Sequence, residues 1–262
     1  MARNTLKNVC KLIDAVNLKV EPEQAFLSDF KRVIELDAQA NSRKPSQSYK
    51  PSSMNCIRCM WYQMMGVEPD PTLPNYSSVG IGWSGSDTHL RVQDVVIKMR
   101  DYGIDCKYVD VAEYVKSHGL NYLDVVAKSG PETKLYHKDL HMSFLCDGII
   151  YYNGVHYILE IKSEASFKFQ RREGVDEKHY NQGTAYSLAF KIPRVIFLYV
   201  NRDLFDVKAY MFKPTDEQRE NIVGLITECD GYVSRMVCPP RPDISRRICE
   251  YCGYRERCKK EL

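Results

Sequence analysis

The sequence predicts an α/β fold, and three observations predict it. First, strand-like runs rich in β-branched and aromatic residues occur at 143–152, 155–163, 195–201 and 206–212. Second, apolar residues recur with a helical period at 177–191 and at about 215–236. Third, 44% of the 262 residues are hydrophobic and 27% are charged. This balance excludes disordered, collagen-like and coiled-coil chains.

The first strong helix signal precedes a loop. The stretch 22–40 predicts a helix with one apolar stripe, formed by Phe26, Phe30, Val33 and Ile34. The stretch 41–55 is rich in Ser, Pro and basic residues, which is typical of a loop. We therefore expect a helix that ends near residue 40, followed by a connection into the apolar and aromatic segment around Trp61.

The middle of the chain predicts three further helices. Ser86 is a suitable N-cap for a helix that runs to about Arg100. Residues 104–140 are less regular, and short helices are expected there at 111–117 and 120–128. No internal repeat interrupts this mixture of strands and helices, so one α/β block accounts for most of the chain.

Nothing in the sequence predicts a membrane span or a signal peptide. No stretch approaches eighteen uninterrupted apolar residues, and the polar N-terminus lacks the apolar core of a signal peptide. A cytoplasmic protein that does not engage a membrane is therefore expected. The 37 Lys and Arg residues against 34 Asp and Glu residues give a net charge of +3, which is too weak to indicate a nucleic-acid partner by itself.

Residues 144–163 carry the sharpest physical inference. Two strand-like runs are joined there by Asn153 and Gly154. This pair is a strong hairpin signal, because a type I′ turn needs a positive φ at both central positions. A two-residue turn at this point pairs Tyr152 with Val155, which fixes the register of the whole hairpin.

In that register Asp147 stands directly opposite Glu160, and Lys162 lies on the same face. Two like charges at opposite positions destabilise a sheet unless a cation lies between them. Mg²⁺ and Mn²⁺ prefer carboxylate oxygens, so the pair fits a divalent-metal site. The alternative is a solvated face on which the carboxylates splay apart or Glu160 pairs with Lys162. The spacing alone does not decide between these interpretations.

The context of these residues resembles a known family. Asp147, followed after twelve residues by Glu160-Ile161-Lys162, is similar to the D-x(n)-E-x-K signature of the PD-(D/E)XK nuclease superfamily. The D-G-I-I and L-E-I-K contexts resemble its RecB-type branch. Two further motifs of that branch have counterparts in the same order, the upstream histidine and a Q-x-x-x-Y motif, which correspond to His89, Gln182 and Tyr186.

The resemblance implies a restriction-endonuclease-like core, with a central mixed sheet flanked by helices, and a role for each matching residue. One or two Mg²⁺ or Mn²⁺ ions would be held by His89, Asp147, Glu160 and the carbonyl of Ile161. Lys162 would orient the attacking water or neutralise developing charge, and Gln182 and Tyr186 would position the substrate strand. Phosphate contacts are expected from the basic residues that follow, Lys168, Arg171 and Arg172.

Five of the ten cysteines form two clusters, namely Cys56 and Cys59 as C-x2-C and Cys249, Cys252 and Cys258 as C-x2-C-x5-C. Clustered cysteines in a reducing compartment are more often metal ligands than disulfides. The two C-x2-C pairs have a spacing that is typical of structural zinc. The other five are expected to be small buried hydrophobic residues, namely Cys10, Cys106, Cys146, Cys229 and Cys238.

The segments around these thiols resemble one iron–sulfur subgroup of RecB-type nucleases, which includes the CRISPR-associated spacer-acquisition nucleases and the AddB nuclease domain. PSSMNCIRCMWYQ is similar to its C-x-R-x-x-(W/Y) segment, and RICEYCGYRERCKK is similar to its closing motif. The resemblance implies a [4Fe-4S] cluster on Cys56, Cys249, Cys252 and Cys258, which would clasp the N-terminal and C-terminal segments together. Cys59 departs from the pattern, so a structural Zn²⁺ with Cys59 as a ligand is the alternative.

The sequence is therefore interpreted as a metal-dependent DNA nuclease. The resemblance implies an exonuclease on single-stranded or end-opened DNA in recombination, repair or spacer processing. Residues 1–45 are expected to form an N-terminal helical extension, and 46–262 the nuclease domain. The expected partners are DNA and other recombination or spacer-acquisition proteins. The alternative is a non-catalytic nucleic-acid-binding or accessory subunit with a structural Zn or Fe–S site. The sequence leaves open the cleavage polarity, the DNA or RNA preference and the oligomeric state.

Overall fold

The structure, a computed structural model, describes residues 21–41, 46–70, 75–129, 132–250 and 252–261. The chain divides into two compact units, one drawn from residues 1–42 and 72–81 and the other from 43–71 and 82–262. The expected domain boundary at residue 45 lies outside the described residues, and so does Cys10.

The first unit contains helix α2 (Pro22–Ala40), which has the predicted bounds. Pro22 stands at the first helical position, where its missing N–H costs no hydrogen bond. Three residues of the predicted apolar stripe, Phe26, Phe30 and Val33, are exposed in the described part of this unit, with 71% of Phe26 accessible, and Ile34 is half-buried. Glu35 accepts the Tyr76 backbone N–H at 3.1 Å, which links α2 to the first residues of helix α4 (Tyr76–Lys98).

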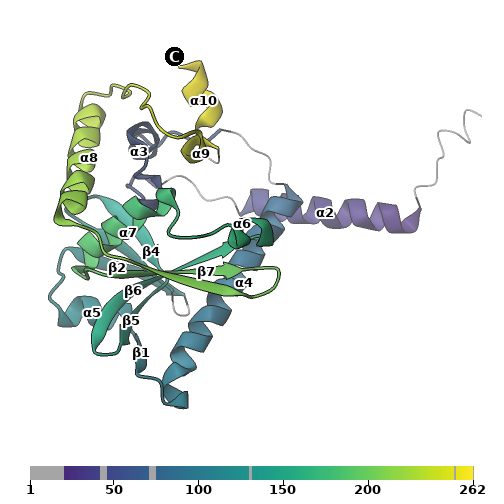
Figure 1. Cartoon of the computed structure of the whole chain (residues 1–262). Coiled ribbons are helices and arrows are strands. Elements are labelled where there is room, and N and C mark those ends of the chain that lie inside the picture. Colours follow the sequence, from purple (N-terminus) through teal and green to yellow (C-terminus); the bar gives the residue numbers. More distant parts are fainter. Residues whose placement is uncertain (1–20, 42–45, 71–74, 130–131, 251, 262) are drawn as a thin grey trace, which may run out of the picture. The chain divides into compact units, whose positions relative to one another are not determined.

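The second unit holds two sheets and the helices around them (Figure 1). The described strands form a five-stranded sheet of order β1-β5-β6-β7-β8 and a three-stranded sheet of order β2-β3-β4. The strands are β1 (Cys106–Val109), β2 (Leu123–Ser129), β3 (Glu132–His137), β4 (Met142–Cys146), β5 (Gly148–Tyr152), β6 (Val155–Glu164), β7 (Val195–Asn201) and β8 (Val207–Phe212). The helices that follow α4 are η2 (Met99–Tyr102), α5 (Val111–Ser117), α6 (Ser166–Gln170), α7 (Glu177–Phe190) and α8 (Asp216–Ser234).

Short helices complete the unit at its ends, namely η1 (Pro51–Ser53), α3 (Ile57–Met64), α9 (Arg246–Cys249) and α10 (Arg255–Lys260). In the larger sheet β6 and β7 run parallel, and the other neighbours are antiparallel. The structure thus confirms a mixed α/β architecture with a mixed sheet. None of the described helices is both long enough and apolar enough to cross a bilayer.

The two faces of the larger sheet are covered by different helices, because successive side chains of a strand point to opposite faces. Leu159 and Ile161 of β6 pack with Val92 and Val96 of α4. On the other face, Ile158 belongs to a core that includes residues of α7 and α8, among them Ala185, Phe190, Ile222 and Ile226. Helix coverage of both faces explains why these strands read as nearly continuous apolar runs.

Three predicted elements differ from the structure. The stretch 120–128 is not a helix, because β2 begins at Leu123 and pairs antiparallel with β3. Ser86 does not begin a helix, because α4 already begins at Tyr76 and Ser86 donates to the Gly82 carbonyl within it. The run 143–152 is not one strand, because β4 and β5 belong to different sheets. In each case pairing or packing with a distant segment outweighs the local signal.

The helix α7 depends on a glycine where it crosses the sheet. A Cβ at Gly183 would lie 2.9 Å from the Phe197 ring and 3.2 Å from the Phe212 ring. We expect Gly183→Ala to lower the free energy of unfolding by about 1–3 kcal/mol, as overpacked core positions do. The matched control is Gly224→Ala in α8, where no described atom lies within 4 Å of the new Cβ. That change should raise stability by about 0.5–1 kcal/mol through helix propensity. Urea unfolding measures both, and a Gly183→Ala variant as stable as wild type would contradict this account of the packing.

Candidate functional site

The predicted hairpin register is confirmed. Tyr152 pairs with Val155 and Gly148 pairs with Leu159, so the next opposite positions are Asp147 and Glu160. The turn residues Asn153 and Gly154 have φ values of 47° and 80°, as a type I′ turn requires. Asp147 lies one residue before β5 begins, at the point where the chain passes from one sheet to the other.

A second hairpin places another carboxylate beside Asp147. Thr133 pairs with Cys146 in the β3–β4 ladder, so the next opposite positions are Glu132 and Asp147. Asp147 is therefore the next position in both hairpin ladders. Glu160 stands opposite it in one ladder, and Glu132 stands opposite it in the other. Sequence reasoning missed Glu132 because 120–128 was interpreted as a helix. Residues 132–137 read Glu-Thr-Lys-Leu-Tyr-His, which shows no regular alternation of polar and apolar residues, so no clear strand signal in the sequence points to it.

His89 joins these acids from the middle of α4. Its Nδ1 lies 3.3 Å from Asp147 Oδ1 and 3.7 Å from Glu132 Oε1. Among the described residues, these three side chains form the group whose ligand atoms all lie within 4.8 Å of one another. Glu160 is not part of that group, so the predicted set of His89, Asp147 and Glu160 is brought near but not gathered around one point.

Hydrogen bonds hold both the side chain and the backbone of Asp147 in place. Its Oδ2 accepts the Ile161 backbone N–H at 2.7 Å, which ties it to β6. Its carbonyl accepts hydrogen bonds from Gln93 Nε2 of α4 at 2.6 Å and from the Tyr108 hydroxyl of β1 at 2.7 Å. These bonds replace the sheet ladder at a residue that ends one hairpin and begins another. The carboxylate is thereby fixed in place, with Oδ1 left toward His89.

Glu160 anchors the other predicted residues. Its Oε1 accepts hydrogen bonds from Lys162 Nζ at 2.6 Å and from Gln182 Nε2 at 2.7 Å. Lys162 Nζ also reaches Gln182 Oε1 at 2.9 Å, and Gln182 Nε2 reaches the Tyr186 hydroxyl at 3.0 Å. Tyr186 in turn donates to the Leu145 carbonyl at 2.9 Å. The structure thus joins β6, α7 and the end of β4 through the residues that the sequence singled out.

The electrostatics of Glu160 favour a cation. The residue is 3% exposed, and its Oε2 has no hydrogen-bond partner among the described residues. Burial raises the pKa of Glu160 to about 7, and the negative charge of Asp147 adds to the rise, while Lys162 and His89 oppose it. An acceptor that is buried without a partner is costly. The donor set of carboxylates and one imidazole fits a divalent cation such as Mn²⁺.

The histidine compensates the acids in the absence of a metal. Burial works to lower the pKa of His89, yet the hydrogen bond to Asp147 and the charges of Asp147, Glu160 and Glu132 leave it raised. Asp147 and Glu132 thus favour the protonated, positively charged form of the imidazole. A metal ion bound at Nδ1 would displace that proton.

The basic residues after β6 are arranged differently from the prediction. Arg172 is not free to contact phosphate, because it forms two 2.6 Å contacts with the Glu164 carboxylate and stacks 4.0 Å from the Tyr199 ring centroid. Lys168 is paired with Glu164 at 3.0 Å and with Asp176 at 3.3 Å. Arg171, in contrast, is exposed. Burying the negative charge of Glu164 is costly, and the positive charges of the neighbouring side chains offset that cost.

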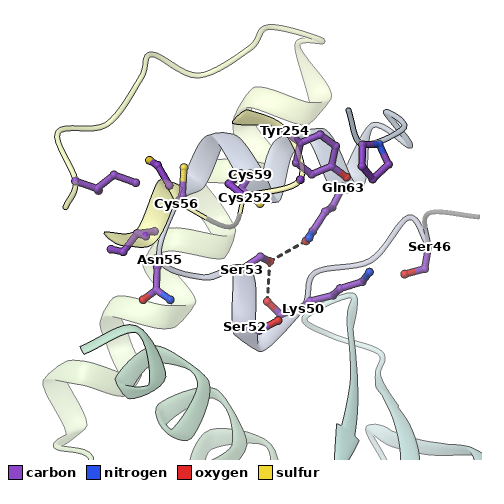
Figure 2. A pocket seen from close by; sticks show the side chains of 15 residues that line it. Ser46, Lys50, Ser52, Ser53, Asn55, Cys56, Cys59, Gln63, Cys252 and Tyr254 are labelled. Atoms are coloured by element: carbon purple, nitrogen blue, oxygen red, sulfur yellow. Dashed lines mark hydrogen bonds between the residues drawn. The ribbon is translucent and has the colours of Figure 1, made fainter. Parts of the chain in front are cut away.

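The clustered cysteines come together from both ends of the second unit. Cys56, Cys59, Cys249 and Cys252 line a cavity of about 370 Å³ (Figure 2). Cys258 lines an adjoining cavity of about 290 Å³ together with the same four thiols. Among the described residues no three of these sulfur atoms lie within 4.8 Å of one another. Elsewhere, Cys106, Cys146 and Cys229 are buried as expected, and Cys238 is half-buried.

Two features of the thiol cavity are relevant to a bound metal. A hydrogen bond with Cys59 lowers the pKa of Cys252 to about 6 and raises that of Cys59. Arg58 is 4% exposed, and its Nε has no hydrogen-bond partner among the described residues. Its NH2 group contacts the Glu261 carboxylate at 3.1 Å. A buried guanidinium beside five thiols fits an anionic metal–thiolate centre.

No known protein family and no curated protein matches the sequence. Several solved structures resemble the fold, two of them as follows. The crystal structure of SSO0001 has a TM-score of 0.47 and 16% identity over 90% of this chain and 98% of that one. The structure of LHK-Exo in complex with dAMP has a TM-score of 0.41 and 10% identity over 73% of this chain and 92% of that one. Neither likeness carries a functional inference for this chain, because the TM-scores and the identities are low.

The raised pKa of Glu160 has a consequence for stability. An unfolded Glu titrates near its ordinary value of 4.5, so the native state is penalised as the pH rises from there to about 7. The isosteric change Glu160→Gln removes this penalty. In a chelator, we expect the variant to be more stable than wild type at pH 8, by on the order of 2–3 kcal/mol, and the advantage to shrink toward pH 4.5.

Urea unfolding across that pH range checks the expectation. The control is Glu220→Gln on exposed α8, which should match wild type at every pH. A Glu160→Gln variant that is less stable than wild type at pH 8 would show that Glu160 is well compensated without a metal.

Proposed function

We propose that this chain is a metal-dependent nuclease that hydrolyses phosphodiester bonds in DNA. The observation that carries the proposal is the buried Glu160 next to Asp147. One of its oxygens accepts a hydrogen bond from Lys162, and the other has no partner in the part of the chain that the structure describes. A divalent cation is the group that satisfies such an oxygen and relieves the repulsion between the two carboxylates. The proposed ligands are His89, Asp147, Glu160 and the Ile161 carbonyl, with Mg²⁺ or Mn²⁺ as the ion.

The chain's own residues then have distinct tasks. A bound ion would lower the pKa of a water molecule and stabilise charge on the scissile phosphate. Lys162 is held between Glu160 and Gln182, so its ammonium group has a fixed direction and can orient that water or neutralise the negative charge that develops on the phosphate. Gln182 and Tyr186 hold Lys162 and the end of β4 in register. They act on the substrate through this positioning as well as by any direct contact.

The substrate class follows from the sequence motifs. The resemblance to RecB-type nucleases favours exonuclease action on single-stranded or end-opened DNA, in recombination, repair or spacer processing. The proposed partners are DNA and other proteins of such pathways, in the cytoplasm. Among the three basic residues predicted to contact phosphate, Arg171 remains the candidate, because Arg172 and Lys168 are engaged with acidic side chains.

Cleavage assays test the nuclease proposal. End-labelled single-stranded and duplex DNA should be degraded by the wild-type protein with Mn²⁺ or Mg²⁺ and left intact in a chelator. Glu160→Gln and Lys162→Met should each lower the rate by at least about 100-fold, whereas the exposed-face control Glu220→Gln should keep it. Folding is checked by urea unfolding of each variant. A wild-type protein that binds DNA but cleaves none of it with either metal would favour the non-catalytic alternative.

We propose further that the thiol cavity holds a [4Fe-4S] cluster on Cys56, Cys249, Cys252 and Cys258. Thiolates suit both iron–sulfur clusters and zinc. Zinc bonds of about 2.3 Å bring four sulfurs to within about 4 Å of one another, and the wider separation here fits a larger centre. The hydrogen bond between Cys59 and Cys252 favours the second candidate, a Zn²⁺ on the two C-x2-C pairs.

Two cysteine variants separate these candidates. With a cluster, Cys258→Ser should give colourless, poorly soluble protein with little iron, and Cys59→Ser should keep the colour and the yield. With zinc, the two variants exchange their behaviour. Cys59→Ser should then give poorly soluble protein, because Cys59 is a ligand, and Cys258→Ser should be tolerated, because Cys258 is not. Metal content, visible absorption and soluble yield of anaerobically purified protein are the measurements. A colourless wild type with one zinc per chain would exclude the cluster and leave the nuclease proposal intact.

A further inference from the structure

Lys178 lies beside the site, although no motif of the sequence includes it. It stands in the first turn of α7, four residues before Gln182, and residues with this spacing share one face of a helix. Gln182 Oε1 contacts Lys162 Nζ at 2.9 Å. The face of α7 that brings Gln182 and Tyr186 to the site therefore continues for one more turn, about 5.4 Å along the helix axis, to Lys178.

The backbone at Lys178 is anchored by two reciprocal amide contacts. Asn55 Nδ2 donates to the Lys178 carbonyl at 2.8 Å, and Asn181 Nδ2 donates to the Met54 carbonyl at 2.7 Å. One amide and one carbonyl come from each segment, so the first turn of α7 is joined to the segment that precedes α3. The Lys178 side chain therefore extends from a fixed position.

Three ammonium groups gather at this end of α7. Lys168 Nζ contacts the carboxylate of Asp176 at 3.3 Å, and Asp176 is the N-cap of α7, two residues before Lys178. Burial lowers the pKa of Lys178, and the charges of Lys168 and Lys162 lower it further, although Asp176 and Glu164 act in the opposite direction. Like charges at such distances disfavour one another, and an anion placed among them relieves the repulsion.

Lys178 differs from the other two lysines because it has no acidic partner. Lys162 is paired with Glu160 at 2.6 Å, and Lys168 is paired with Glu164 at 3.0 Å. In the part of the chain that the structure describes, no ion pair or side-chain hydrogen bond engages the Lys178 ammonium group. The side chain is also half-buried, so water solvates its charge only in part. An anion from outside the chain is the partner that this charge lacks.

We infer that Lys178 binds a backbone phosphate of the substrate strand, next to the phosphate that is cleaved. The inference rests on the proposed nuclease function for the identity of the anion, and it adds a strand-binding residue to that function. Lys162 is the ammonium group beside the carboxylates, so Lys178 has no part in the chemical step. The contact is one that Arg172 and Lys168 do not offer, because both are engaged with acidic side chains.

Binding of a fluorescently labelled oligothymidylate strand to the anaerobically purified chain, in a chelator, tests the inference without cleavage. Lys178→Met should reduce the slope of log affinity against log salt by about 0.7, which is the contribution of one phosphate contact on a single strand, and should weaken binding about 5-fold at about 0.1 M salt. Lys178→Arg keeps the charge and should match wild type.

The matched control is Lys116→Met on α5, where the lysine is exposed and the neighbouring Tyr114 contacts Phe190 at the other end of α7. This variant should keep the wild-type slope. Thermal unfolding separates strand binding from a structural role. Because Lys178→Met removes one of three neighbouring positive charges, it should melt no lower than wild type.

Three results would overturn the inference: a wild type that binds no single strand, a Lys178→Met variant with the wild-type salt slope, or an equal loss of slope in Lys116→Met. Weaker binding with an unchanged slope and a lower melting temperature would mark Lys178 as structural. Failure of the nuclease proposal looks different, because the slope then falls as expected and no DNA is cleaved with Mn²⁺ or Mg²⁺. Conversely, cleavage by wild type with an unchanged slope in Lys178→Met would preserve the nuclease and exclude this contact.

Discussion

The site depends on the position of Asp147 between two antiparallel hairpins. The β3–β4 hairpin ends at Cys146 and the β5–β6 hairpin begins at Gly148, so one residue belongs to the registers of both. Each register brings one more carboxylate to its side. The backbone at this residue lacks a continuous ladder, and Gln93 and Tyr108 supply its hydrogen bonds instead. Helix α4 and strand β1 therefore take part in holding the carboxylate where it is.

Two acidic residues of β6 show what distinguishes a structural carboxylate from one that needs an ion. Glu164 is buried, but Arg172 contacts both of its oxygens at 2.6 Å, and its pKa is lowered despite the burial. Glu160 lies four residues earlier on the same face and is equally buried. One of its oxygens has no partner among the described residues, and its pKa is raised. The charge of the first carboxylate is compensated by neighbouring side chains, and the charge of the second is compensated only in part.

The thiol cavity lies in the same unit, between helix α3 and the C-terminal segment. Arg58 and Tyr62 of α3 both contact the carboxylate of Glu261, so the C-terminal segment is already attached to α3 by polar contacts. The Tyr62 ring stacks on Tyr254 with centroids 4.9 Å apart. A metal centre held by Cys56 and the C-terminal cysteines would strengthen an attachment that the protein makes by itself. The proposals above accordingly give the cysteines a role in stability and the carboxylates a role in chemistry.

The sequence by itself determined the elements whose signals are local. The helix at 22–40, the helix at 177–191 and the Asn153–Gly154 turn follow from spacing and from backbone preferences within a few residues. That turn determines the hairpin register, in which Asp147 stands opposite Glu160. Tertiary structure decided the rest. Most of the stretch 120–128 belongs to a strand, which begins at Leu123, because β3 is available as a partner. The Arg172 side chain is largely buried because it pairs with the buried Glu164. Glu132 reached the site because two hairpins meet at one residue, and such a meeting depends on packing between segments that no local pattern records.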